Sequence, residues 1–205
     1  MTRRRGGRQP APLTGADLRE AALRVVARSS LDRLTVREVA QELGVTAPAV
    51  HYHLRGGADL ADRVVEAVAA GIELRDDPDL DWVERYVALV DRMDQAFLRY
   101  PGTGLRALTA TGPSAAADRL TAAALDILLD AGFDRPAATE IFASTYLLFT
   151  GWLATRGRTE QGSVHPAWLA AAGHGGSGPL HAALRRVLTG TPVPTPDPTP
   201  TRGRR

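Results

Sequence analysis

The chain contains 205 residues, 44% of them hydrophobic and 23% charged, a composition that suits one or two compact domains. It has no cysteine, which excludes disulfides and thiolate metal sites, and no apolar run near the roughly 20 residues that cross a bilayer. The net charge is only +2, and the arginine-rich N-terminus lacks the apolar segment of a secretory signal, so we expect a cytoplasmic protein.

The positive charge gathers near the N-terminus. Residues 1–56 hold 10 Arg and 5 acidic residues, whereas residues 57–205 hold 15 Arg and 18 acidic residues. All basic residues are Arg, which suits phosphate and guanine contacts but is also what a GC-rich genome encodes. Residues 1–13 have little to bury and predict a flexible basic arm, which either enters a DNA minor groove or only aids solubility. The arginines of this arm are Arg3, Arg4, Arg5 and Arg8.

Helical periodicity begins directly after the arm. Thr14 is expected to cap a helix over residues 15–29. Apolar residues recur on one face of this helix and predict its buried side. They are Leu18, Ala21, Ala22, Val25 and Val26.

Residues 34–54 carry the most informative pattern, two short helices joined by a turn at Gly44. Thr35 and Glu38 stand at capping-box spacing, which marks the start of the first helix. Gly44 ends it, because glycine takes the left-handed conformation at low cost. The apolar face of this helix, at i, i+3, i+4 and i+7, consists of Val36, Val39, Ala40 and Leu43.

The second helix of the pair has one apolar and one polar face. Val45 is expected to pin the turn to the core, while Val50 and Leu54, four residues apart, pack inward. Thr46 is expected to cap the helix, with Pro48 in its first turn. The pair reads as a helix-turn-helix, whose second helix lies in the major groove of DNA.

Longer helices follow this pair. A helix over residues 58–74 leads to the break at Asp76-Asp77-Pro78-Asp79, which marks a domain boundary. Further helices are predicted over residues 82–100, 105–109, 115–131, 135–156 and 180–188. The Gly-rich segment 157–178 is expected to be a loop with a helical turn around Trp168. Because no segment reads as a strand, we expect an all-α fold.

The segments Leu34–Ala40 and Leu43–Leu54 closely resemble the TetR (tetracycline repressor) family of transcription regulators. The resemblance covers about residues 14–74. Weaker similarity to the ligand-binding domain of the tetracycline-repressor branch continues at Tyr100-Pro101-Gly102, Ala131-Gly132-Phe133 and Phe149-Thr150-Gly151-Trp152. The family implies a homodimer whose N-terminal heads span an operator, and a helical effector domain in which ligand shifts the heads so that they no longer span it.

Two positions depart from the family pattern. His51 stands where the family usually has Tyr, and Gly57 stands where it usually has a Lys that contacts phosphate. Arg55 or the arm is a candidate to replace that contact. The residues around Arg106 do not reproduce the drug-site pattern of the tetracycline-binding members, so neither tetracycline nor its metal is expected here.

The resemblance and the helical pattern together divide the chain into five parts. We expect a three-helix DNA-binding head, a connecting helix, and a larger helical domain for effector binding and dimerisation. The ranges are 1–13 for the arm, 14–57 for the head, 58–75 for the connecting helix, 76–189 for the effector domain and 190–205 for a disordered Pro/Thr tail.

The candidate DNA contacts lie in and around the helix-turn-helix. Arg37 is expected to reach a backbone phosphate, and Tyr52 to reach one through its hydroxyl. The full set is Thr35, Arg37, Thr46, Ala47, Pro48, Ala49, His51, Tyr52, His53 and Arg55.

The candidate ligand contacts are aromatic side chains with a few polar groups among them, as a small-molecule pocket between helices requires. Arg106 is the expected polar anchor. The full set is Trp82, Tyr86, Met93, Phe97, Arg106, Thr109, Leu125, Thr145, Phe149 and Trp152.

The expected function is a ligand-responsive, dimeric transcriptional repressor of a palindromic operator in double-stranded DNA. The effector is expected to be an apolar or aromatic small molecule, and no cofactor, catalysis or membrane contact is expected. Dimerisation is expected through residues 135–156 and 180–189. The apolar surface assigned to it consists of Ile141, Leu148, Phe149, Trp152 and Leu184.

Two alternatives remain open at this point. One is a constitutive DNA-binding protein without an effector, which a filled C-terminal core would favour. The other is a helical metal-binding protein or enzyme that uses His165, His174 and His181.

Overall fold

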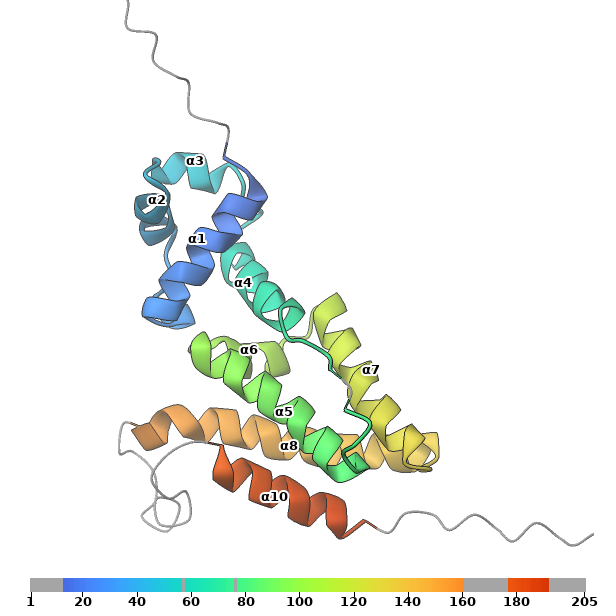
Figure 1. Cartoon of the computed structure of the whole chain (residues 1–205). Coiled ribbons are helices and arrows are strands. Elements are labelled where there is room, and N and C mark those ends of the chain that lie inside the picture. The colour runs from blue at the N-terminus through green and yellow to red at the C-terminus, as the bar shows by residue number, and fades with distance from the viewer. Residues whose placement is uncertain (1–12, 57, 76, 161–176, 192–205) are drawn as a thin grey trace, which may run out of the picture.

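The computed structural model describes residues 13–56, 58–75, 77–160 and 177–191, and every regular element within these ranges is helical (Figure 1). This confirms the all-α prediction. The predicted arm before Leu13, the turn around Trp168 and the tail beyond Thr191 lie outside the described residues. The elements are α1 (Gly15–Arg28), the 3-10 helix η1 (Leu31–Arg33), α2 (Val36–Leu43), α3 (Ala47–His51), α4 (Asp59–Ala70), α5 (Trp82–Arg99), α6 (Thr103–Thr109), α7 (Ala115–Asp130), α8 (Arg135–Glu160) and α10 (Gly178–Thr189).

Side-chain caps fix where several helices begin. The Thr14 hydroxyl accepts a hydrogen bond from the Asp17 backbone N–H at 3.2 Å, and the Asp17 carboxylate accepts one from the Thr14 N–H at 2.9 Å. The Asp81 carboxylate and the Ser114 hydroxyl likewise accept hydrogen bonds from the backbone N–H groups of Glu84 and Ala117, at 2.9 and 3.0 Å, at the starts of α5 and α7. Each cap satisfies a backbone donor that the first helical turn leaves free.

The head, defined as α1 with η1, α2 and α3, packs around a small apolar core. Helix α1 contacts both α2 and α4, and α2 contacts α3. The fully buried side chains here include Leu18, Val26, Val39 and Val50, one or more from each of the three α-helices. A three-helix unit of this size depends on such a core, because its surface is large relative to its volume.

The body, defined as α5 to α10, lies below the head in Figure 1 and is joined to it by α4. Helix α4 packs on α1 of the head and on α6 and α7 of the body. Helices α5 and α8 each contact α7 and α10. The head also touches the body through a backbone hydrogen bond from the Leu31 N–H to the Pro101 carbonyl at 2.8 Å.

Four details differ from the sequence-based expectations. Helix α8 continues to Glu160, so the expected loop does not begin at residue 157. Helix α4 ends at Ala70 rather than residue 74, although Ile72 beyond it is still buried. The short η1 helix was not predicted. Val45 does not pin the turn to the core: its side chain is 37% exposed, because the turn is held by backbone hydrogen bonds instead.

The contact between α6 and α5 depends on a glycine. A Cβ added at Gly104 would lie 2.8 Å from Phe97 Cγ, and Phe97 is itself buried. We therefore expect Gly104→Ala to lower the free energy of unfolding by about 1–3 kcal/mol, as overpacking does. Urea unfolding followed by circular dichroism would measure this loss.

The matched control is Gly15→Ala in the first turn of α1, where an added Cβ meets nothing within 4 Å. It should leave stability unchanged or slightly raised. Equal stability of the two variants would show that α6 does not pack on Phe97 as closely as described.

Candidate nucleic-acid interface and internal cavity

Backbone and capping interactions set the angle between α2 and α3. The Thr35 N–H donates to the Glu38 carboxylate at 3.0 Å, and the Glu38 N–H donates to the Thr35 hydroxyl at 3.2 Å, which confirms the capping box. Gly44 has φ +67° and ends α2, as predicted. The N–H groups of Gly44 and Val45 then donate to the carbonyls of Gln41 and Ala40. This left-handed turn redirects the chain into α3.

Helix α3 is short and mostly exposed, and one buried side chain anchors it to the head. It spans five residues, and only Val50 among them is fully buried. Tyr52 directly follows it and is 88% exposed, with its ring edge-on to His53. In the described part of the chain, the Thr46 side chain makes no capping bond. A helix held from one side in this way offers its other side to a partner.

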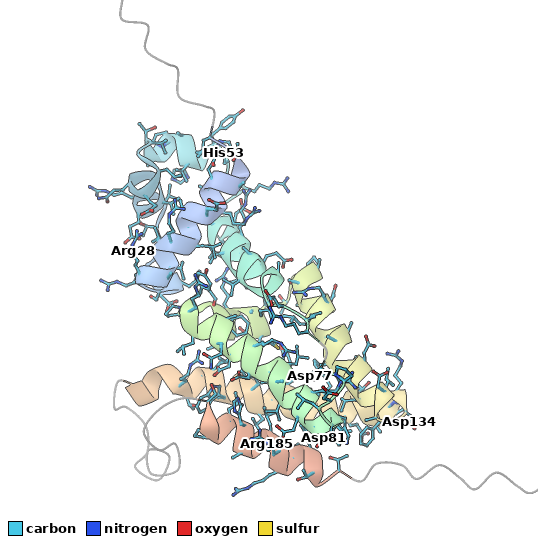
Figure 2. All side chains as sticks on the ribbon, viewed as in Figure 1. Arg28, His53, Asp77, Asp81, Asp134 and Arg185 are labelled. Carbon is cyan, nitrogen blue, oxygen red and sulfur yellow. The ribbon has the colours of Figure 1, made fainter. Side chains whose placement is uncertain are left out.

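The predicted DNA contacts differ in how exposed they are on the head. Figure 2 shows His53 at the end of the head away from the body. Three of the residues, Ala47, Ala49 and His53, are half-buried. The exposed ones are Thr35, Arg37, Thr46, Pro48, His51, Tyr52 and Arg55. Seven of the ten predicted contacts are thus exposed on the head or directly after it, although the Thr35 hydroxyl is engaged with Glu38 at 2.9 Å.

Arg63 on α4 is a residue that the sequence reasoning missed. Its guanidinium donates to the His53 carbonyl at 2.8 Å and pairs with Asp59 at 2.8 Å. The Arg63 guanidinium, together with the Arg55 backbone N–H, holds the pKa of the Asp59 carboxyl below its usual value. The spacing of Asp59 and Arg63, four apart on one helix, was the available signal.

A second cluster braces α1 against α2. The Glu42 carboxylate accepts hydrogen bonds from Arg28 at 2.6 Å and from Arg24 at 2.7 Å. These two guanidinium groups, Arg28 first, lower the pKa of Glu42. Because the cluster is exposed, its role is to fix geometry more than to add stability.

A cavity of about 1620 Å³ opens between α4, α5, α6, α7 and α8, with part of α1 at its rim. It is larger than the roughly 300–1,000 Å³ typical of ligand pockets. Of the predicted ligand contacts, those that line it are Tyr86, Met93, Phe97, Arg106, Thr109, Thr145 and Phe149.

Three predicted ligand contacts do not line this cavity. Trp82 packs edge-on against Phe133, with ring centroids 5.3 Å apart. Trp152 is buried, and its indole N–H donates to Asp94 at 3.0 Å. Leu125 is half-buried against the body core. Helical periodicity could not separate these residues from the cavity wall, because core and cavity positions are equally apolar.

The floor of the cavity is aromatic, and three hydroxyl groups there are already hydrogen-bonded. The rings of Phe97 and Phe149 stack with centroids 6.3 Å apart. The Tyr86 hydroxyl shares a hydrogen bond with the Thr145 hydroxyl at 2.6 Å, and the Tyr146 hydroxyl donates to the Leu108 carbonyl. Burial raises the pKa of Tyr86 to about 12, outweighing the opposite effect of Thr145.

Polar contacts close the cavity on the side of α4. Arg106 on α6 pairs with Asp62 at 2.6 Å. The Glu66 carboxylate accepts hydrogen bonds from the Ser114 hydroxyl at 2.6 Å and from the Ala116 N–H at 3.1 Å, at the start of α7. Arg119 donates to carbonyls at the end of α4, including that of Ala69 at 3.1 Å. Helix α4 is therefore also a wall of the cavity.

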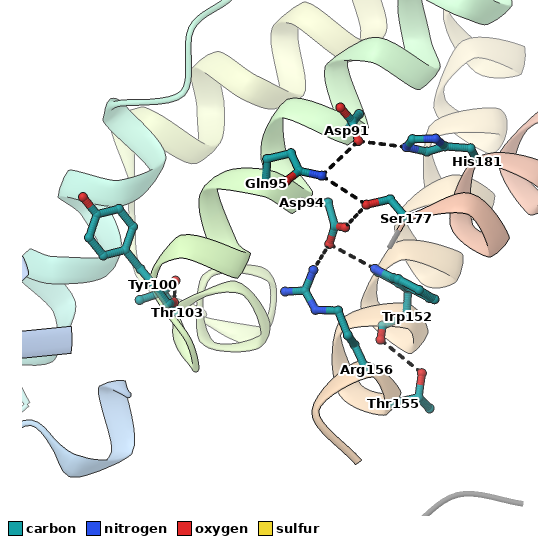
Figure 3. A network of polar contacts seen from close by, with 10 residues as sticks. All are labelled: Asp91, Asp94, Gln95, Tyr100, Thr103, Trp152, Thr155, Arg156, Ser177 and His181. Atoms are coloured by element: carbon teal, nitrogen blue, oxygen red, sulfur yellow. Dashed lines mark hydrogen bonds and ion pairs between the residues drawn. The ribbon is translucent and has the colours of Figure 1, made fainter. Parts of the chain in front are cut away.

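A buried polar network holds the other side of the body (Figure 3). Asp94 on α5 is 1% exposed and accepts hydrogen bonds from Trp152 and Arg156 of α8. It also accepts one from the Ser177 hydroxyl at 2.7 Å, at the start of α10. The buried charge is thus paired and hydrogen-bonded, as such charges need to be.

Other kinds of site have little support in the described part of the chain. No cluster of three or more His, Asp or Glu side chains there is arranged to hold a metal ion. His165 and His174 lie outside the described residues, and His181 instead faces Asp91 at 3.0 Å. None of the described helices is both long enough and apolar enough to cross a membrane.

This arrangement of a helix-turn-helix head and a larger helical body is typical of DNA-binding transcription regulators. Residues 18–64 match the family model described as "Bacterial regulatory proteins, tetR family". The match covers most of the head and the first half of α4, and it agrees with the resemblance noted in residues 34–54.

One curated relative is similar to the chain over a longer stretch than the family model. The chain is 34% identical over 115 residues to the class A tetracycline repressor protein from transposon 1721 of Escherichia coli, a match covering 55% of this chain. The match spans about half, 53%, of that relative's length.

Solved structures resemble the chain over most of its length. A possible TetR family transcriptional regulator from Streptomyces coelicolor A3(2) is 26% identical, with a TM-score of 0.65 over 85% of this chain and 88% of that one. The TetR-Q116A protein of Acinetobacter baumannii AYE, in complex with minocycline, shares the fold at 22% identity. Its TM-score is 0.65 over 87% of this chain and 96% of that one.

The raised pKa of Tyr86 predicts how stability changes in alkali. Between its unfolded value of 10.0 and its folded value of about 12, the unfolded chain loses the phenol proton first, so the folded state loses stability as pH rises. We expect Tyr86→Phe to lose less stability over this range, by at most about 2 kcal/mol. Urea midpoints at about pH 9 and about pH 11 would measure the difference. Identical losses in both proteins would mean that Tyr86 is not buried as described.

Proposed function

We propose that this protein is a dimeric transcriptional repressor that binds a palindromic operator and leaves it when a small molecule occupies the cavity. The observation that carries this proposal is the double role of α4. The same helix supplies Arg63, which holds the chain after α3, and the cavity-lining residues Asp62 and Glu66. An occupant of the cavity therefore presses on the helix that positions the head.

The cavity also separates this proposal from its closest alternative. A constitutive DNA-binding protein needs no ligand pocket, because nothing has to bind in its body. The space of about 1620 Å³ beside Phe97 and Phe149 thus favours a ligand-responsive protein. Nearly complete release demands that the effector prefer the released state by roughly 5.5 kcal/mol.

The surface of α3 supports DNA as the partner of the head. Tyr52 and His51 are exposed, while Val50 seats the helix from behind. Arg37 on α2 is exposed, and an exposed guanidinium can bind a backbone phosphate. We propose these side chains, with Thr46 at the start of α3, as the contacts that read and hold the operator.

The first test of this proposal is a substitution on the exposed face. Duplex DNA selected from a random pool by the wild-type protein serves as the probe. Tyr52→Ala should weaken binding by roughly tenfold, the loss of about one good contact, with an unchanged melting temperature. Arg37→Gln should weaken binding and reduce the slope of log K against log salt by about 1. Fluorescence anisotropy across a salt series would measure both.

Arg135→Gln at the start of α8 is the matched control. It removes the same charge from an exposed position in the body and should leave binding to the selected DNA unchanged. Wild-type affinity in both Tyr52→Ala and Arg37→Gln would place the DNA-binding surface elsewhere.

The dimer requires a revised surface. Ile141, Phe149, Trp152 and Leu184 were expected to face a partner, but all four are buried within the single chain. The outward face of α8 instead carries Leu147, which is 72% exposed, among small residues. The exposed residues of this face are Ala143, Ser144, Leu147, Gly151 and Ala154. We propose that two copies pair along this face, where small side chains let helices approach closely.

Leu147→Glu tests this pairing. A charge at the centre of the interface should convert the protein to a monomer at micromolar concentration while leaving it folded, since the side chain is exposed within one chain. Leu98→Glu on α5, where the leucine is 46% exposed, is the control and should remain dimeric. Analytical ultracentrifugation measures both. A dimeric Leu147→Glu protein would exclude this face.

A further inference from the structure

The charged residues around the cavity differ in whether they have partners. Arg63 is engaged with Asp59 and the His53 carbonyl. Both carboxylate oxygens of Glu66 are engaged at the start of α7. These groups are satisfied before any ligand arrives, so they leave little charge for a ligand to neutralise.

Two arginines at the rim remain for a ligand. Arg19 of α1 lines the cavity and is exposed, and no ion pair or hydrogen bond engages its side chain in the described part of the chain. Arg106 of α6 lines the same cavity and, within the described residues, pairs with Asp62, which is itself 61% exposed. A pair this exposed is held weakly, because solvent screens both charges.

Another part of the cavity lining is apolar and carries no charge. The stacked rings of Phe97 and Phe149 lie there with Met93, and the nearby hydroxyl groups of Tyr86 and Thr145 bond to each other. This wall offers flat apolar contact and few polar groups free for a ligand. The cavity therefore pairs an aromatic floor with a cationic rim.

We propose that the effector is an aromatic carboxylic acid. Its flat ring system stacks beside Phe97 and Phe149, and its carboxylate lies between Arg19 and Arg106. Arginine suits this role because its planar guanidinium binds carboxylates through paired hydrogen bonds. This inference rests on the proposed function, and it adds the chemical class of the ligand and the atoms through which it acts.

The same placement explains how the ligand acts on the head. The ligand carboxylate replaces Asp62 as the partner of Arg106, which removes the ion pair that joins α4 to α6. It also engages Arg19, which belongs to α1 of the head. Binding thus exchanges a contact between α4 and the body for one between the ligand and the head. A neutral ligand has no carboxylate to replace Asp62, so it leaves the ion pair between Asp62 and Arg106 in place.

The test compares anthracene-2-carboxylate with anthracene-2-carboxamide, which has nearly the same shape and no charge. Calorimetric titration of the full chain should show the carboxylate binding roughly tenfold more tightly than the amide. Arg19→Gln and Arg106→Gln should each reduce this preference by roughly threefold or more, while affinity for the amide stays unchanged. Arg99→Gln, an exposed arginine of α5 that does not line the cavity, is the matched control and should keep the preference.

Asp62→Asn should change the affinity for the carboxylate in the opposite direction to the two arginine variants. It frees Arg106 without removing any positive charge, so it should raise affinity for the carboxylate while weakening operator binding. Equal affinity of the two probes for the wild-type protein, no binding of either, or equal losses for both probes in the arginine variants would overturn the proposal.

Operator release separates this inference from the proposed function. Release of selected DNA by the carboxylate, and less by the amide, supports both. Release by both probes alike keeps a ligand-responsive repressor but overturns the preference for acids. Selective binding of the carboxylate without release of DNA keeps the acid site and overturns the repressor mechanism.

Discussion

Helix α4 is attached to the head and to the body by separate polar contacts, and the rest of the molecule depends on this double attachment. Toward the head, Arg63 holds the His53 carbonyl at the end of the candidate DNA-binding surface. Toward the body, Glu66 caps the start of α7, and Asp62 pairs with Arg106 of α6. A rigid helix fixed at both ends passes a displacement from one end to the other, which is the physical requirement for coupling two sites.

The contacts around α4 differ in strength, and the difference divides their roles. The pair of Asp62 and Arg106 is exposed and contributes on the order of 1 kcal/mol or less. Apolar contacts between a ligand and the cavity lining offer more, at about 25 cal/mol for each Å² of apolar surface, mostly the ligand's own, removed from water. In the proposed mechanism the apolar contacts supply the affinity, and the arginines select the ligand and direct its effect.

The side of the body away from α4 is built to resist movement. Asp94 carries a buried charge (Figure 3). Arg156 of α8 pairs with this charge, and Trp152 of α8 and Ser177 at the start of α10 donate hydrogen bonds to it. Breaking such an arrangement typically costs about 3–5 kcal/mol, because one charge is left buried and unpaired. An occupant of the cavity is therefore expected to move α4 and α6, which are held by weaker pairs, rather than α8 and α10.

The sequence by itself determined the local structure of this protein. The capping spacing of Thr35 and Glu38, the left-handed Gly44 and the apolar periodicity each depend on residues within one or two turns, so the helices and the helix-turn-helix followed from short-range chemistry. Only the tertiary structure decided which apolar residues line the cavity and which fill the core. Trp152 and Phe149 lie three apart on α8 and look alike in sequence, yet one bonds to Asp94 and the other faces the cavity. Their roles, like the pairing of Asp62 with Arg106 44 residues away, depend on how distant helices pack, and no local pattern encodes that.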